Sequence, residues 1–290
     1  MMPQQGLARV EDGRGPASAG HARPRGEIFA IAGLRKVFGE DEQPYVALDG
    51  VDLSIRNGEF LCLLGASGCG KSTLLNLLAG FEKPSSGTLL YRDKQIGGPG
   101  KERVMFFQDA GAALLPWLTV QQNVEFGLRL EGIVPAERRE RVEEYIQLVG
   151  LAEHRHKVPS EISGGMLQRL QIARALAVDP DVFLMDEPFA ALDAITRRRM
   201  HVALLDVWQR TKRTIVFVTH DIMEALTLAD RIAMMSVGPG SRIAYLVEVT
   251  APRPRNPGDP ALGAQFLELE NLLHGIRPGG GASPEAGPPA

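Results

Sequence analysis

The strongest constraint on the fold is the segment GASGCGKST at residues 65 to 73, which follows the apolar run FLCLL. Gly65, Gly70, Lys71 and Ser72 match the phosphate-loop pattern G-x-x-x-x-G-K-[ST]. Such a loop needs a buried strand before it and a helix after it, because backbone N–H groups and the helix N-terminus must point at the anion. FLCLL and KSTLLNLLA supply both, and Gly80 is predicted to end the helix.

This loop predicts binding of ATP with Mg²⁺. Lys71 would carry a full charge to the β and γ phosphates, and the Ser72 hydroxyl would ligate Mg²⁺. A tight structural turn with a surface lysine is the alternative interpretation, and the flanking strand and helix disfavour it. Cys69 is interpreted as a small tolerated residue rather than a redox switch, although a thiol at a helix N-terminus can have a lowered pKa. The predicted nucleotide-binding residues here are Gly65, Ala66, Ser67, Gly68, Cys69, Gly70, Lys71, Ser72 and Thr73.

Two acids, Asp186 and Glu187, follow the apolar run VFLM. In a parallel sheet, a strand that ends in two acids delivers them beside the phosphate loop. Asp186 is therefore a predicted Mg²⁺ contact and Glu187 a predicted general base for the attacking water. For an isolated dipeptide, a helix N-cap would be the better interpretation.

Composition excludes several classes of protein. The chain is 44% hydrophobic and 23% charged, with a formal net charge of -3, so no strong field points to nucleic acid. Two cysteines form no disulfide framework, and no apolar run approaches the ~20 residues of a membrane helix. We therefore expect a cytoplasmic protein without nucleic-acid partners, peripheral if it serves a membrane process.

Hydrophobic patterning divides the chain into three parts. Residues 1–26 are predicted to be a disordered tail, with a partner-binding arm as the alternative. Residues 27–250 alternate strands and helices, which predicts a mostly parallel sheet flanked by helices, with a helical subdomain at about 109–178. Residues 251–290 are a Pro/Gly-rich extension with one amphipathic helix at about 261–275, expected to pack on the domain rather than to dock a partner.

Further motifs follow one another in a fixed order, and together they resemble the ATP-binding subunit of an ABC transporter over about residues 28–248. They are the phosphate loop, Gln108 in VMFFQ, the turn ISGGMLQR from 162, MDEP, the Ala-Leu-Asp step at 191 to 193, and His220. The resemblance implies an α/β fold with a P-loop NTPase core, a helical subdomain and a small antiparallel β region. It also implies a homodimer that sandwiches two Mg-ATP.

Individual roles come from the same resemblance. Gln108 would sense Mg²⁺ and the water, and would link the site to the membrane partner. His220 would hydrogen-bond the γ-phosphate and position the water. The predicted catalytic residues are Lys71, Gln108, Glu187 and His220. Phe38 in KVFG matches the aromatic residue that stacks on adenine, with Tyr45 as a rival. The signature residues that would reach the other subunit's γ-phosphate are Ser163, Gly164 and Gly165, and Asp193 would lie at the interface.

The chain departs from the family pattern in two places. Ile162 and Met166 stand where the usual signature has Leu and Gln, so a hydrogen bond near the ribose is lost while Ser-Gly-Gly remains. We expect hydrolysis to be retained but slower. The stretch DAGAALLPW after Gln108 is also slightly longer than usual, which affects the fit to the membrane partner.

The text around Pro116 and Trp117 resembles the importer branch for nitrate, alkanesulfonates and taurine. In that branch two transmembrane permease subunits contact the ATPase at the cytoplasmic face of the cell membrane. A periplasmic or extracellular solute-binding protein selects the cargo, so this chain carries little information about it. The alternatives are an ABC ATPase of another branch, either an exporter or a non-transport switch, and a nucleotide-binding regulator that does not hydrolyse ATP.

Overall fold

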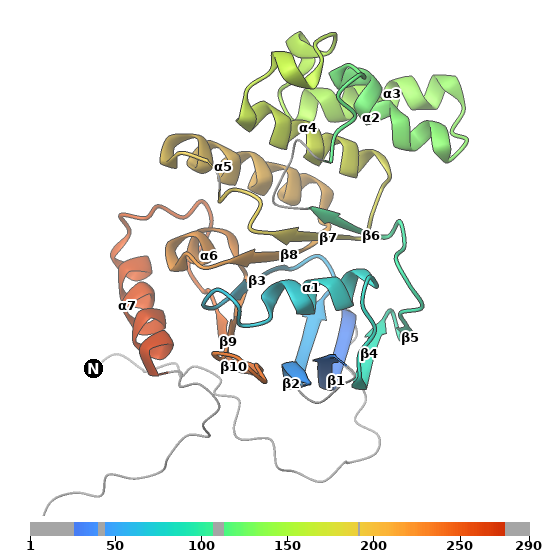
Figure 1. Cartoon of the computed structure of the whole chain (residues 1–290). Coiled ribbons are helices and arrows are strands. Elements are labelled where there is room, and N and C mark those ends of the chain that lie inside the picture. The colour runs from blue at the N-terminus through green and yellow to red at the C-terminus, as the bar shows by residue number, and fades with distance from the viewer. Residues whose placement is uncertain (1–25, 40–43, 107–112, 191, 276–290) are drawn as a thin grey trace, which may run out of the picture.

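The computed structural model describes residues 26–39, 44–106, 113–190 and 192–275. Gln108 and Ala191 lie outside these ranges. Two sheets with helices around them make up the described part of the molecule (Figure 1). Within these ranges, no helix is both long and apolar enough to cross a membrane.

The larger sheet has six strands in the order β10-β9-β3-β8-β7-β6. The five strands from β9 to β6 run parallel to one another, and β10 pairs antiparallel with β9 at the edge. The strands are β3 (Phe60–Leu64), β6 (Arg103–Phe106), β7 (Val182–Asp186), β8 (Thr214–Thr219), β9 (Arg231–Met235) and β10 (Ile243–Glu248). The parallel sheet expected from strand–helix alternation is confirmed.

A second sheet is antiparallel, with strand order β2-β1-β4-β5. Its strands are β1 (Glu27–Phe38), β2 (Tyr45–Arg56), β4 (Ser86–Tyr91) and β5 (Lys94–Gln95). Phe38 and Tyr45 are directly opposite one another at the end of the β1–β2 pair. This sheet is the small antiparallel region that the family resemblance implied.

The period-2 alternation of strand side chains builds a core on each face of the larger sheet. Phe60, Cys62 and Leu64 of β3 face one hydrophobic cluster, and Leu61 and Leu63 face the other. The second cluster also contains apolar residues of β1, β2 and α1 (Lys71–Ala79), so α1 lies between the two sheets (Figure 1). α1 ends at Gly80, whose φ of 85° is the left-handed conformation of a glycine cap.

The remaining helices cover the other face and extend beyond it. Three of them, α2 (Val120–Leu130), α3 (Pro135–Leu148) and α4 (Gly164–Ala177), pack together on one side of the molecule (Figure 1). Between α3 and α4 lie the short 3₁₀ turns η1 (Ala152–His154) and η2 (Pro159–Glu161). The others are α5 (Ala194–Thr211), α6 (Ile222–Leu228) and α7 (Pro260–Gly275).

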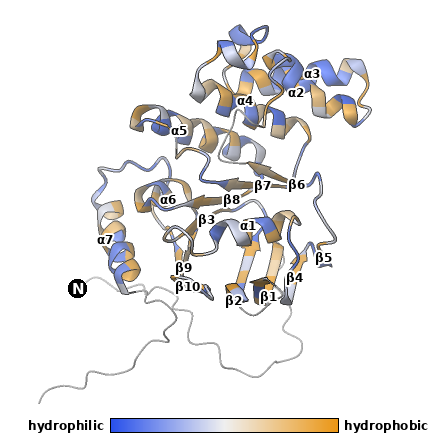
Figure 2. Cartoon of the chain, viewed as in Figure 1, coloured by the Kyte–Doolittle hydropathy of each residue, from blue (hydrophilic) through white to orange (hydrophobic). Residues whose placement is uncertain are grey.

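Helix α7 packs back on α6 through one face. Leu262 and Leu269 are buried, whereas Leu267 is exposed. Figure 2 shows the corresponding mixture of hydrophilic and hydrophobic residues along this helix. Two arginines before it, Arg253 and Arg255, fasten the connecting segment to the end of α6.

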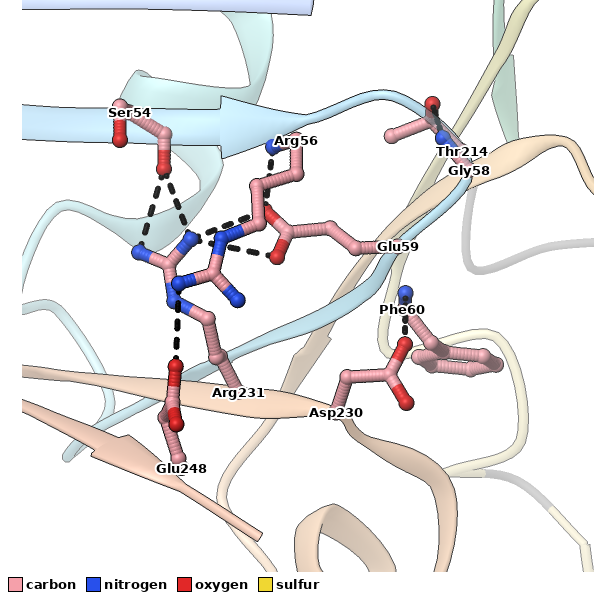
Figure 3. Close-up of polar contacts among 9 residues, drawn as sticks. All are labelled: Ser54, Arg56, Gly58, Glu59, Phe60, Thr214, Asp230, Arg231 and Glu248. Atoms are coloured by element: carbon pink, nitrogen blue, oxygen red, sulfur yellow. Dashed lines mark hydrogen bonds and ion pairs between the residues drawn. The ribbon is translucent and has the colours of Figure 1, made fainter. Parts of the chain in front are cut away.

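A buried ion pair fastens the antiparallel sheet to the parallel one at the end where β3 and β9 begin (Figure 3). Arg231 donates to the carboxylate of Glu59 at 3.2 Å and to the carbonyl of Ser54. Burial raises the pKa of Glu59, although the guanidinium of Arg231 opposes the shift. This cluster lies at the N-terminal ends of the strands, so the opposite edge is left for the nucleotide site.

Candidate nucleotide-binding site

A cavity of about 420 Å³ opens at the C-terminal ends of the parallel strands. Its lining comes from the phosphate loop, from the end of β7 and from the start of β2: Tyr45, Ser67, Gly68, Gly70, Lys71, Ser72, Thr73, Asp186 and Glu187. Residues that the sequence placed in two separate motifs therefore share one pocket.

Lys71 is held inside the phosphate loop. Its Nζ donates to the carbonyls of Gly65 and Ala66, each at 2.8 Å, and the residue is only 5% exposed. Gly70 has a φ of 89°, and an added Cβ there would lie 2.8 Å from Leu48 Cδ2. Only glycine fits this turn without strain, so the loop geometry follows from the sequence pattern.

Cys69 is a buried thiol beside this lysine. Burial raises its pKa, although the nearby Lys71 ammonium opposes the shift. A protonated thiol is a poor nucleophile, which agrees with its interpretation as a small tolerated residue.

Glu187 has an unusual backbone at the end of β7. Its φ is 44°, a left-handed conformation that is rare for a non-glycine residue and is concentrated at functional sites. Its N–H donates to the carbonyl of Val218 on the neighbouring strand at 3.2 Å. Its carboxylate Oε2 lies 3.2 Å from Nδ1 of His220, which follows β8. Two adjacent strand ends thus bring the carboxylate and the imidazole together at the pocket.

The signature turn lies elsewhere in the subunit. Ser163 is the N-cap of α4, and Gly164 and Gly165 form that helix's first turn. An added Cβ on Gly165 would lie 2.9 Å from Thr196 Cγ2, so α4 begins beside the first turn of α5, whose N-cap is Asp193. None of Ser163, Gly164, Gly165 or Asp193 lines the pocket.

The aromatic residues differ from expectation in their placement. Tyr45, the rival for the stacking role, lines the pocket, whereas Phe38 does not. Phe38 lies under the ammonium of Lys36, 4.7 Å from its ring centroid. The sequence alone did not show that Phe38 and Tyr45 lie opposite each other, because this depends on the pairing register of β1 and β2.

Two polar residues near the site, the buried Gln168 and the largely covered His201, were not predicted. Gln168 of α4 donates to the carbonyl of Pro188 at 2.6 Å, directly after Glu187. His201 of α5 contacts Glu224 of α6. Both depend on contacts between distant helices, and no local pattern in the sequence signals them.

Mg²⁺ requires few protein ligands when it binds with a nucleotide, since it keeps waters and takes phosphate oxygens. The described residues contain no group of three or more His, Cys, Asp or Glu side chains able to hold a metal alone. The pocket does bring together the Ser72 hydroxyl and the Asp186 carboxylate, which are the oxygen donors that such a shared site needs.

Comparisons with known proteins agree with this geometry. Residues 48–190 match the family model described as ABC transporter. A bicarbonate transport ATP-binding protein, CmpD, of Synechococcus elongatus is 42% identical over 88% of this chain and 91% of its own length. The nitrate import ATP-binding protein NrtD of the same organism is 45% identical over 76% of this chain and 80% of its own length.

Solved structures give the same result. CbiO1 from Clostridium perfringens, part of an ABC transporter complex, has a TM-score of 0.72 at 27% identity and covers 86% of this chain and 98% of its own. The ATP-binding cassette MJ0796, a dimer bound to ADP and Pi, has a TM-score of 0.65 at 30% identity, covering 77% of this chain and all of its own. The predicted fold class and the predicted membership of the ABC transporter family are confirmed. This chain belongs to the ABC transporter family, as one of its ATP-binding, ATP-hydrolysing subunits.

Proposed function

We propose that this ATPase energises the import of a small anion, working as a peripheral subunit on the cytoplasmic face of the cell membrane. Relatives named for nitrate import and bicarbonate transport support this cargo class. Nitrate, bicarbonate, alkanesulfonates and the zwitterion taurine all carry a compact negatively charged group, and a separate binding protein would select among them. The observation that carries the catalytic part is the contact of Glu187 with His220 at the edge of the phosphate-loop pocket.

In the proposed reaction, Lys71 and the N-terminus of α1 hold the phosphates. Ser72 and Asp186 would hold Mg²⁺, which neutralises charge on the β and γ phosphate oxygens when it is bound. Glu187 orients and polarises the attacking water, and His220 holds both the carboxylate and the γ-phosphate. Catalysis is then mostly positioning and charge stabilisation.

The site would be completed by a second copy of the chain. Ser163, Gly164 and Gly165 present the N-terminus of a helix of 14 residues, a geometry suited to an anion, yet they lie outside the pocket of their own subunit. The dimeric arrangement of MJ0796 supports pairing of this kind. We therefore assign the signature turn to the partner copy's γ-phosphate and Asp193 to the interface between copies.

We assign the adenine contact to the two opposed aromatic residues of the β1–β2 pair. Tyr45 borders the phosphate loop, and Phe38 lies directly across from it on the neighbouring strand. Side chains directly opposite in an antiparallel pair project to the same face. The base would therefore meet both rings, with Tyr45 nearer the phosphates.

Contact with two permease subunits is assigned to the loop that carries Trp117. The indole is 73% exposed, although its loop is tightly held. Asn123 is fully buried and bonds the loop at both ends: it accepts from the N–H of Leu115 and donates to the carbonyls of Leu115, Leu118 and Thr119. A rigid loop that presents a large exposed aromatic is typical of a partner contact. Gln108, outside the described residues, would connect this loop to the site.

The Glu187→Gln variant tests the catalytic assignment. It should bind ATP with the affinity of the parent and lose at least about 100-fold in turnover, because a general base commonly contributes that much. Undiminished hydrolysis would refute the assignment.

Transport is tested separately by ATP-dependent uptake of labelled nitrate, bicarbonate or taurine into vesicles that contain the complex. Uptake of none of these anions would refute the cargo class.

A further inference from the structure

His201 connects the two catalytic turns from a helix that carries neither. It lies on α5, and its side chain is 12% exposed. Its Nε2 is 2.6 Å from Oε1 of Glu224 on α6. Its ring packs on Phe189, with centroids 5.7 Å apart and planes tilted by 52°. One imidazole thereby touches the turn after β7 and the helix after β8.

Glu224 links His201 to the turn that holds His220. Its Oε2 accepts a hydrogen bond from the hydroxyl of Thr219, and that hydroxyl accepts one from the N–H of Asp221 at 3.0 Å. The Asp221 carboxylate in turn accepts from the N–H of Glu224 at 3.0 Å. Thr219 and Asp221 flank His220 in the sequence, so these bonds fix the backbone on both sides of the imidazole.

Phe189 makes the corresponding connection to Glu187, two residues before it. The Phe189 ring also packs on Phe217 of β8, with centroids 5.7 Å apart. Glu187 holds a left-handed φ, which persists only where the surroundings fix it. The packing of His201 on Phe189 is one of the contacts that fix this turn.

We propose that His201 is a positioning residue that sets Glu187 and His220 relative to each other and couples both to α5. It acts through Phe189 and Glu224 and touches no reacting atom. Asp193, the N-cap of helix α5, is the residue assigned to the interface between copies, so closure of the dimer would reach both catalytic turns through one helix. This inference rests on the roles proposed for Glu187 and His220.

The test compares two variants of His201 in the full-length chain. His201→Ala should lower kcat for ATP hydrolysis about tenfold, because small misplacements of catalytic groups are costly. Its affinity for a fluorescent ATP analogue should stay within about twofold of the parent, since the phosphate loop is untouched. His201→Gln keeps an N–H donor for Glu224 and should recover kcat to within about threefold of the parent.

Controls separate positioning from stability. Val207→Ala removes a buried side chain from the same helix and should lower the melting temperature while leaving kcat unchanged below the transition. The exposed Val202→Ala should change neither.

The inference is overturned if His201→Ala keeps the parental kcat, if its kcat falls no further than that of Val207→Ala, or if His201→Gln does not restore kcat. If Glu187→Gln hydrolyses ATP normally in the same series, the proposed function itself fails. If Glu187→Gln is inactive and His201→Ala is normal, only this inference fails.

Discussion

Arg255 offers a sharp test of how the C-terminal segment is attached. Its guanidinium donates four hydrogen bonds to backbone carbonyls: Nε to Ala251 at 2.8 Å, Nη1 to Leu226 at 2.9 Å and Ala229 at 2.5 Å, and Nη2 to Val249 at 3.1 Å. Two of these carbonyls lie at the C-terminus of α6, where helix carbonyls lack intrahelical partners and a positive charge is favourable.

The size of the effect follows from two opposed contributions. A hydrogen bond from a charged donor contributes about 1.5–3 kcal/mol, and four carbonyls would lose theirs in Arg255→Met. Against this, burial lowers the pKa of Arg255 to about 10, and the nearby charge of Arg253 is the next cause. The charged form of Arg255 is therefore destabilised at this position relative to water. We expect a net loss of about 3 kcal/mol, well below the simple sum over four such bonds, because the carbonyls can partly rehydrate and the cost of burying the charge disappears.

Thermal and urea unfolding of Arg255→Met measure this loss. At about 2–4 °C per kcal/mol for a chain of this size, the melting temperature should fall by about 6–12 °C. Arg242→Met, at an exposed position, is the matched control and should stay within about 0.5 kcal/mol of the parent. A loss below about 1 kcal/mol for Arg255→Met would refute the view that this arginine anchors the segment before α7.

Three further predictions concern the nucleotide and the buried ion pair. Met166→Gln should hydrolyse ATP at least as fast as the parent, and a large loss of turnover would contradict the reasoning about the signature. Tyr45→Ala should weaken ATP binding more than Phe38→Ala, as titration calorimetry would show, because only Tyr45 lines the pocket; the reverse order would restore Phe38 as the main contact. Because the pKa of Glu59 is raised in the folded state, protonation of its carboxyl stabilises the fold. This contribution to stability is fully present below the ordinary pKa of 4.5 and is lost as the pH rises through the folded value. Glu59→Gln should therefore flatten the fall in melting temperature over that rise, whereas an unchanged slope would show that Glu59 titrates normally beside Arg231.

The local parts of the site follow from the sequence. The phosphate loop could be predicted because its glycines, lysine and serine are adjacent in the chain and their geometry is set by one strand and one helix. Asp186 and Glu187 could be placed beside it because parallel strands deliver their C-terminal ends to one edge. Gly80 as the end of α1 is a local rule of the same kind.

The connections between elements could not be predicted in this way. Which of Phe38 and Tyr45 borders the phosphate loop depends on the pairing register of β1 and β2. The chain from Phe189 through His201 to Glu224 joins three elements whose order in space is set by the sheet. His201 in sequence is an ordinary helix residue, and its partners Phe189 and Glu224 come from the turn after β7 and from α6. Likewise, Arg253 and Arg255 lie in a segment whose composition resembles a linker, although both are bonded to the core.

In the proposed dimer, each copy's signature turn completes the other copy's nucleotide site. Light scattering after size exclusion tests it on Glu187→Gln, which should hold ATP without consuming it. With Mg-ATP the mass should double from that of one 31.5 kDa chain, and adding Ser163→Arg should prevent the doubling while ATP still binds. A single-chain mass for Glu187→Gln saturated with Mg-ATP, or doubling that survives Ser163→Arg, would contradict this shared arrangement of the site.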